Sequence, residues 1–446
     1  MPALANDSGD LIYYSSPPGR ETAAGNVAIW TGETDIFGDQ HGWLPNEKVL
    51  AYLAIFPVCD QSKYGNCIES VSARRIGTSR WTEGRPLIRE IPTEMGRSAL
   101  VYRDGTPPNV VGFTQEDPAK GIPAGSSPSI WDLPFAPHGG GSRYWLSVAV
   151  GSTLAGFSES GFSRFNVVLR PIDNKAFSEP LYLLPFQRGY NFPDGFEYRV
   201  AIRLGLTEKV IPKFFYGRLV APNIELDKNR LIISGRPGTF PVARTDWIPY
   251  ASLSERAKAG TPSPEILGLP QGWGNFFAWG SVLGNDDRDF EGFQIFEKDL
   301  KQLGSNTSWS FKSMTTSYGK CKLQEVGGFV SSNSLLFSTR PPEWNPAEKS
   351  LTYRMASLSR DEKGNLNRGN LDLAMSKELV RCLWGFNPTV SSGAKVSVVY
   401  EDGKSSVGTS AVRVTKDWLY LNVSGYTFSK PTVKIELYPR VKKKAK

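Results

Sequence analysis

The sequence predicts a mainly β protein made of several β-sandwich domains with few short helices. Glycine and proline are frequent, at 44 and 32 residues, and 12% of the residues are aromatic, which suits turns and half-buried strands. Several segments alternate apolar and polar residues with the period of two that a strand requires. A chain of 446 residues also exceeds the size of a single hydrophobic core, so we expect about two to four folded domains.

Composition and patterning divide the chain into five regions. We expect an extended N-terminal arm (1–45), a β-domain with a short cysteine loop (46–175), a β-rich middle domain with one or two helices (176–310), a C-terminal β-region that ends in an immunoglobulin-like sandwich (311–440), and a basic tail (441–446).

The first half of the chain contains the strongest strand signals. Residues 48–59 form an apolar run that predicts a buried strand, whereas residues 106–141 have the proline, glycine and serine content of a loop. Further strands are predicted at 143–150, 163–172 and 196–206. The last of these alternates most regularly, with apolar side chains on one face and mostly charged ones on the other.

The middle of the chain mixes short strands with two helices. Residues 231–234 and 240–243 are predicted to be short strands separated by a Gly-Arg-Pro-Gly turn. Helices are predicted at 250–258 and 293–303, and the second has apolar residues at helical spacing. We interpret this second helix as one that covers a sheet edge.

The last part of the chain returns to short strands at regular spacing. They are predicted at 395–400, 412–414, 418–423 and 432–437, with a turn at Glu401-Asp402-Gly403. An Asp-Gly pair between apolar runs favours a hairpin. Closely spaced short strands of this kind indicate the immunoglobulin-like sandwich.

Four cysteines indicate two disulfides and an oxidising compartment. Cys59 and Cys67 bracket a short loop, while Cys321 and Cys382 lie in the last third of the chain. Of the three pairings, Cys59–Cys67 with Cys321–Cys382 keeps each bridge within one predicted domain. Zinc is the alternative, but there is no Cys-x-x-Cys pair to support it.

The N-terminus contains a short pattern that suggests export. Ala3-Leu4-Ala5 has the small-x-small form that signal peptidase cleaves, although no apolar run precedes it. We therefore expect a mature protein that begins near Asn6 and is secreted or held at the cell surface. No stretch approaches the 18 or so apolar residues of a membrane-spanning helix, so we expect no transmembrane segment.

The charge pattern favours anionic surfaces over nucleic acid. The formal net charge is +8, yet the basic residues are scattered, apart from the lysines in the tail 441–446. A nucleic-acid binder concentrates them on one stripe or helix, so no nucleic-acid partner is expected. The spread charge predicts weak attraction to cell-wall polymers or lipid headgroups.

Several ordered motifs resemble one family. They are Val330-Ser331-Ser332-Asn333-Ser334, Arg381-Cys382-Leu383-Trp384-Gly385-Phe386, Gly425-Tyr426-Thr427-Phe428-Ser429 and Phe215-Tyr216-Gly217-Arg218-Leu219 with Pro222-Asn223-Ile224. Together they resemble a family of exported actinobacterial proteins of uncharacterised function, over about the last 250 residues. The resemblance implies export and a role at the cell envelope. It assigns no catalytic residue.

Catalytic patterns in the sequence are weak. A Ser-His-Asp or Cys-His site needs an imidazole base, and the two histidines, His41 and His138, both lie in loop sequence outside any known motif. Paired carboxylates that support glycoside hydrolysis have candidates at Glu116-Asp117 and Asp286-Asp287, which also fit solvated turns. We assign no catalytic residue.

Residues 271–292 contain the candidate binding residues. Asp286, Asp287, Asp289 and Glu291 supply oxygen ligands at a density that suggests calcium, although the segment lacks the EF-hand glycine and glutamate. A charged turn is the alternative, and no other cofactor is expected. Trp273 and Trp279 lie in a glycine-rich segment just before, where aromatic rings form either a platform for sugar rings or part of the core.

These observations lead to three functional hypotheses. The first is a non-enzymatic envelope or surface protein that binds a cell-wall polymer or a surface protein. The second is an exported carbohydrate-active hydrolase that uses paired carboxylates. The third is a structural subunit of a surface assembly. The ligand and the oligomeric state are left open.

Overall fold

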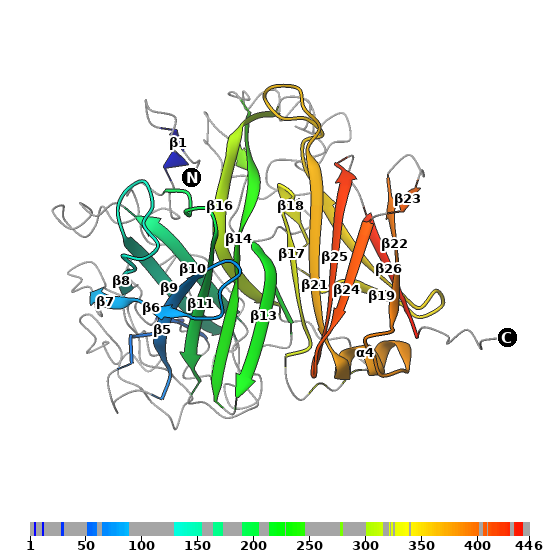
Figure 1. The fold of residues 1–446 in the computed structure, drawn as a ribbon, viewed down its shortest axis with the longest axis horizontal. Coiled ribbons are helices and arrows are strands. Elements are labelled where there is room, and N and C mark those ends of the chain that lie inside the picture. The colour runs from blue at the N-terminus through cyan, green and yellow to red at the C-terminus, as the bar shows by residue number, and fades with distance from the viewer. Residues whose placement is uncertain are drawn as a thin grey trace.

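The computed structural model describes a chain that consists mostly of strands. It describes residues 4–5, 11–12, 28–30, 51–59, 65–88, 129–153, 164–172, 190–204, 214–227, 229–245, 277–279, 300–314, 321, 323, 326–338, 340–400, 405–407, 409–428 and 432–439. Within these residues there are 26 strands and one helix (Figure 1). The prediction of a mainly β fold is confirmed.

The longest layer, which we call the central sheet, runs across the molecule. Its strands are, in order, β3 (Ala28–Trp30), β4 (Ala51–Ile55), β9 (Arg143–Thr153), β10 (Arg164–Ile172), β16 (Leu300–Met314), β12 (Phe214–Gly217), β17 (Gly328–Ser332), β21 (Arg368–Ser376), β25 (Trp418–Thr427) and β24 (Thr409–Val414). All neighbours are antiparallel except β12 and β17, which run parallel.

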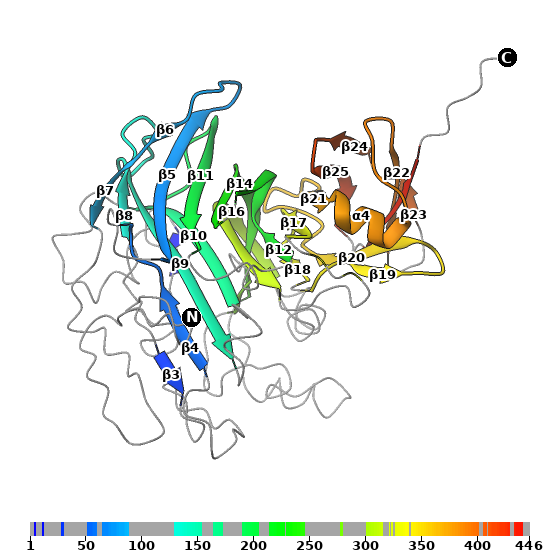
Figure 2. The ribbon, with the colours of Figure 1, turned by 90° about the horizontal axis from the view of Figure 1, so that it is seen from below.

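Two further sheets cover the central sheet. The first covering sheet contains β6 (Thr82–Glu83), β5 (Cys67–Arg75), β11 (Phe196–Arg203), β14 (Arg230–Thr245) and β13 (Leu219–Asp227), and the far half of β14 pairs with β16. The second covering sheet contains β18 (Leu336–Phe337), β20 (Ser350–Ala356), β26 (Thr432–Tyr438), β22 (Gly393–Val399) and β23 (Ser405–Val407), with β19 (Glu343–Asn345) beside β20. Figure 2 shows the two covering sheets at opposite sides of the molecule.

The two faces of the central sheet contribute to two different hydrophobic cores. Phe215 and Phe329 point into the core shared with the first covering sheet, whereas Phe214, Tyr216 and Val330 point into the core shared with the second. Successive side chains of a strand point to opposite faces, so an unbroken apolar run such as Phe214–Tyr216 is buried on both sides. The central sheet is therefore the common layer of two β-sandwiches.

The chain passes from the central sheet to the first covering sheet at Gly217 and Arg218. A β-carbon at Gly217 would lie 2.2 Å from the carbonyl oxygen of Ser310, so only glycine fits this close approach. Arg218 is fully buried, and its guanidinium lies 4.5 Å from the ring centres of both Phe240 and Phe337. The crossing therefore places a cation at the boundary between the two cores.

The guanidinium of Arg218 binds the segment that follows β17. Nη1 donates to the carbonyls of Ser332, at 3.0 Å, and Ser334, while Nη2 donates to the carbonyl of Leu335 at 2.9 Å. These bonds satisfy buried main-chain acceptors, which rarely remain unpaired in folded proteins. They join two motifs that lie more than a hundred positions apart in the sequence.

Both predicted disulfides are present. Cys59–Cys67 closes a short loop before β5, and its Cα atoms are 4.9 Å apart. Cys321–Cys382 joins a buried residue of the second core to α4 (Lys377–Trp384), with Cα atoms 5.9 Å apart. Both distances lie within the normal range for a bridge. There is no free cysteine.

Of the remaining five strands, the first two pair with each other, and the other three extend the layers described above. They are β1 (Leu4–Ala5), β2 (Leu11–Ile12), β7 (Arg85–Ile88), β8 (Ser129–Asp132) and β15 (Phe277–Trp279). β3 pairs with β4, so part of the predicted N-terminal arm joins the central sheet. The expected domain limits stay a prediction, and the limit between 310 and 311 falls within β16. The immunoglobulin-like topology of the C-terminal region also stays a prediction.

The structure corrects three of the local predictions and adds one helix. Residues 300–303 belong to β16 and not to a helix, because their partners on β14 extend the strand. The two short strands predicted at 231–234 and 240–243 form one continuous strand, β14. Residues 129–132 form β8 inside a predicted loop, and α4 was not predicted. The helix predicted at 250–258 lies outside the described residues.

Candidate functional site

Among the described residues, the buried charged side chains are Arg218 and Asp372, with exposed fractions of 0% and 6%. Burying a charge is costly, so such a residue has either a structural or a functional reason to be there. Asp372 lies on β21 beside the first covering sheet, and its Oδ2 accepts a 3.4 Å hydrogen bond from the Ala221 N–H of β13. This hydrogen bond joins β13, the last strand of the first covering sheet, to β21 of the central sheet.

A group of amide side chains surrounds the Asp372 carboxylate. Asn422 on β25 donates to Oδ1 at 2.8 Å, and Asn370 donates to Oδ2 at 3.1 Å. Asn422 also donates to the Asn370 side-chain oxygen at 2.9 Å, and the Asn333 side chain accepts from the Asn370 N–H at 2.7 Å. We call these four residues the Asp372 cluster. It is a connected network in which each amide has at least one partner.

The alternation of β21 explains why the cluster forms here. Leu371 and Leu373 point into the second core, so Asn370 and Asp372 point to the opposite face of the central sheet. Pairing of β21 with β25 places Asn422 directly opposite Asp372. The cluster therefore occupies the face of the central sheet next to β13, the last strand of the first covering sheet.

The strand that borders the cluster has an irregular backbone. The register of β13 against β14 shifts between Val220 and Asn223, which marks a β-bulge. Ala221 within this bulge has φ of 52°, in the left-handed region that residues other than glycine seldom adopt. Its N–H is the group that donates to Asp372. Bulges and strained residues concentrate near functional sites, so this geometry favours a functional role for the Asp372 cluster.

Burial shifts the pKa of Asp372. Desolvation raises the pKa of this carboxyl above its ordinary value, although hydrogen bonds from Asn422, Asn370 and the Ala221 N–H and the positive charge of Arg236 act in the opposite direction. A carboxyl with a raised pKa holds a proton at higher pH than usual and then serves as a hydrogen-bond donor or an acid. Asp372, the single carboxyl of the cluster, is therefore buried and has a raised pKa.

The substitution Asp372→Asn should flatten the dependence of stability on pH. A raised folded-state pKa means that the folded protein binds the proton more tightly than the unfolded chain does. Its stability therefore falls as the pH rises from about 3.9, the ordinary Asp pKa, to the folded value. An amide does not titrate, so this decline should disappear. Urea unfolding at a series of pH values measures it, and equal slopes for variant and parent would contradict the prediction.

Asp361 provides a control of opposite sign. This exposed carboxylate has a lowered pKa, chiefly because the Asn365 side chain donates a hydrogen bond to it. Its stabilising contribution is present above the ordinary Asp pKa and is lost as the pH falls through the lower folded value. Asp361→Asn should therefore change the pH slope in the direction opposite to Asp372→Asn.

A row of side chains on β25 continues the face beside the cluster. Trp418, Tyr420, Asn422 and Ser424 alternate along this strand, and the Tyr420 hydroxyl donates to the Asn223 side chain on β13 at 2.9 Å. The Arg413 guanidinium of β24 lies 4.0 Å from the centre of the Tyr420 ring. Trp418, Asn422 and Ser424 are half-buried. The face thus contains a half-buried indole, which also packs against the first core, together with amide and hydroxyl groups.

The residues that the sequence singled out are only partly within the described chain. Trp273, Asp286, Asp287, Asp289 and Glu291 lie outside it, as do His41 and the Glu116-Asp117 pair. Trp279 is placed only as backbone, in β15 beside β14. In the described part of the chain no group of three His, Cys, Asp or Glu residues is arranged to hold a metal ion. The calcium prediction stays untested.

His138 has a structural environment. Its Nδ1 accepts a hydrogen bond from the Gly140 N–H at 3.1 Å, and its Nε2 lies 2.9 Å from the Arg143 carbonyl. This arrangement places the ring proton on Nε2 and uses both nitrogens within one turn. The ring also contacts Tyr144 and Tyr190. His138 therefore holds the turn that leads into β9.

Comparison with known proteins adds no family to this description. No family model matches the chain, and a search of curated proteins found no significantly similar sequence. The resemblance to exported actinobacterial proteins therefore stays a prediction. None of the described helices is long and apolar enough to cross a membrane.

Sequence reasoning did not single out the Asp372 cluster. Asn370, Asp372 and Asn422 belong to strands whose other face is apolar, which is the ordinary pattern of a half-buried strand. The signal that was present is chemical: on these two strands the outward positions carry amides and a carboxylate at aligned register. Only the pairing of the strands shows that these groups meet.

Proposed function

We propose that the protein is exported and binds a polysaccharide of the cell envelope on the face formed by β21, β25 and β24 beside β13. The observation that carries this proposal is the Asp372 cluster, which groups amide and carboxylate side chains on the sheet face that also contains Trp418, four residues before Asn422 on β25. The role is that of a binding protein.

The chemistry of the face suits sugars. Neighbouring hydroxyls of a sugar ring both donate and accept hydrogen bonds, and Asn and Asp side chains offer both functions in a planar arrangement. The apolar face of a sugar packs well on an aromatic ring, and Trp418 provides a half-buried one. The side chains on one face of β25 follow one another along the strand, so successive side chains can contact successive sugar units of a polymer.

The disulfides support the location in this proposal. Bridges form and persist where thiols are not kept reduced, as outside the cell. The chain has two bridges and no free cysteine. Outside a cell, an extended polymer is an abundant target for a sheet face.

The substitution Asn422→Ala tests the binding role. It removes the donor to both Asp372 and Asn370 and should weaken binding to the recognised polysaccharide about tenfold, equivalent to about 1.4 kcal/mol. A glycan array followed by calorimetry with the best polymer measures it. Asn365→Ala, in an exposed loop between β20 and β21, is the matched control and should bind normally. Unchanged binding by a folded Asn422→Ala protein would contradict the proposal.

The raised pKa of Asp372 supports a second candidate function. A raised pKa is the direction of shift that the acid of a glycoside hydrolase requires, and such an enzyme also needs a second carboxylate. Incubation with envelope polysaccharides distinguishes the two functions. Release of sugars by the parent protein that Asp372→Asn abolishes would favour a hydrolase, whereas tight binding without product would favour the binding protein.

A further inference from the structure

The outward face of the first covering sheet contains a row of arginines. They are Arg74 on β5, Arg199 and Arg203 on β11, and Arg230 and Arg236 on β14. Their strands pair side by side, and the inward positions are filled by residues of the first core such as Val200 and Ile233. The arginines therefore lie together on the opposite face.

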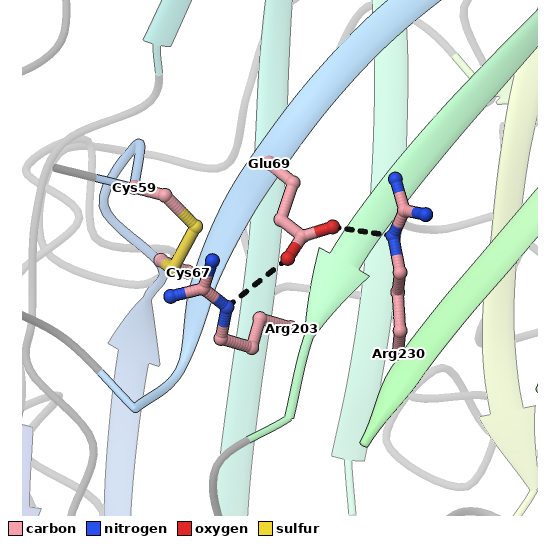
Figure 3. The surroundings of a disulfide bond; sticks show 5 residues. All are labelled: Cys59, Cys67, Glu69, Arg203 and Arg230. Atoms are coloured by element: carbon pink, nitrogen blue, oxygen red, sulfur yellow. Dashed lines mark hydrogen bonds and ion pairs between the residues drawn. A yellow bond between two sulfur atoms is a disulfide. The ribbon is translucent and has the colours of Figure 1, made fainter. Parts of the chain in front are cut away.

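Three of these arginines form ion pairs with two glutamates. Arg74 forms an ion pair with Glu197 at 2.6 Å. Glu69 lies between Arg203, at 3.0 Å, and Arg230, close to the Cys59–Cys67 bridge (Figure 3). The shift in register near Ala201 leaves Glu69 as the extra residue of β5, which brings its carboxylate to both arginines.

Arg199 has no such ion pair among the described residues. In the described structure no carboxylate lies within ion-pair distance of it, and its best hydrogen bond is a long one, 3.4 Å, from Nη2 to the Ser72 hydroxyl. Its Nε is buried and has no acceptor. An exposed guanidinium would be satisfied by water, but water cannot reach this nitrogen. Arg199 is thus a partly desolvated cation with incomplete hydrogen bonding.

The surroundings of Arg199 fix its position. Its guanidinium lies 4.8 Å from the centre of the Trp81 ring, and the Arg74 guanidinium lies 4.4 Å from the same ring. Stacking on an aromatic ring restrains the guanidinium plane and leaves its edge for oxyanions. Burial lowers the pKa of Arg199; nearby Arg230 and Arg74 also lower it, while Glu225 and Glu83 raise it. An arginine nevertheless remains charged at neutral pH.

Arg236 extends the positive region toward the Asp372 cluster. Ser234 lies directly opposite Arg199 on β14, and Arg236 is two residues further along the same face. Arg236 also has no carboxylate within ion-pair distance among the described residues, and its charge is felt at Asp372. Diagonal neighbours at this spacing are about 7–8 Å apart, so one extended ligand reaches both.

We infer that Arg199, held by Trp81 and followed by Arg236, is a subsite for an oxyanion, and that the bound polysaccharide is acidic. The expected ligand group is a carboxylate or a phosphodiester, because each presents a pair of oxygens that matches the planar fork of the arginine guanidinium. The anion subsite stands on Arg199 itself, whereas its assignment to a polysaccharide rests on the proposed function.

The test compares the full chain with the variant Arg199→Gln. Binding is measured by calorimetry with polygalacturonate, which carries carboxylates, with a poly(glycerol phosphate), which carries phosphodiesters, and with neutral dextran. We expect Arg199→Gln to weaken binding to an acidic polymer at least tenfold and to reduce its salt dependence. Arg381→Gln, on the exposed face of α4, removes the same charge elsewhere and should change nothing.

The outcomes separate the two proposals. If Arg199→Gln binds only one of the two acidic polymers more weakly than the parent does, the anion of that polymer is the one recognised. If no polymer binds, weaker binding of inorganic pyrophosphate by Arg199→Gln than by the parent still supports the subsite. Equal binding of acidic polymers by parent and Arg199→Gln overturns the inference, while Asn422→Ala still decides the proposed function. Thermal unfolding provides a check on folding. A second variant, Arg236→Gln, should also bind the acidic polymer more weakly than the parent, but by a smaller factor than Arg199→Gln.

Discussion

Replacing Arg218 with methionine should lower the free energy of unfolding by at least about 3 kcal/mol. Methionine keeps much of the volume between Phe240 and Phe337 but cannot donate to the carbonyls of the 332–335 segment. A buried acceptor that loses its donor costs about 1–3 kcal/mol, and three acceptors are affected. Arg218→Lys should also be destabilising, because a single ammonium cannot replace the fork.

Urea unfolding followed by circular dichroism measures this effect. Arg368→Met is the matched control, because Arg368 is exposed and donates to one carbonyl, that of Gly425, at 3.1 Å. The control should lose less than about 1 kcal/mol. An Arg218→Met protein as stable as the parent would show that the carbonyls find other donors.

Removal of the Cys321–Cys382 bridge should have an effect of similar size. The bridge spans 61 residues, and constraining a loop of this length restricts the unfolded chain by about 4 kcal/mol. It also fastens α4, whose Leu379, Val380 and Trp384 are buried in the second core. A double Cys→Ser variant should therefore unfold at clearly lower denaturant concentration.

The short bridge is the natural comparison. Cys59 and Cys67 are separated by 8 residues, for which the same relation gives about 2.5 kcal/mol. Thermal unfolding of both double variants under identical conditions should show the larger decrease for Cys321–Cys382. The reverse order would mean that strain or residual structure in the unfolded chain, and not loop length, determines the effect.

The parts of the fold that the sequence predicted are those with a local signal. The alternation of 196–206 predicted β11, and the alternation within 163–172 predicted β10. β22 pairs with β23, the next strand after the predicted Asp-Gly turn, although β23 itself was not predicted. The cysteine pairing followed from spacing alone. In each case the information lies within about ten neighbouring residues or in one residue type.

The missed parts depend on distant partners or on brief signals. Residues 300–303 have apolar spacing that fits a helix, yet β14 provides a strand partner that outweighs it. α4 is only 8 residues long, and its evidence is the Ser376 cap that accepts from the Leu379 N–H and the left-handed Gly385 at its end. The Asp372 cluster needs the pairing of β21 with β25 and the bulge of β13, none of which one segment reveals.

The shared central sheet makes the two halves of the molecule mechanically dependent. Phe214 and Phe215 are adjacent residues of one strand but stabilise different cores. Unfolding of either covering sheet would expose apolar surface on the central sheet, at a cost of about 25 cal/mol for each square ångström. Unfolding of one sandwich would therefore destabilise the other, and the two should unfold in a single cooperative transition and not as independent domains.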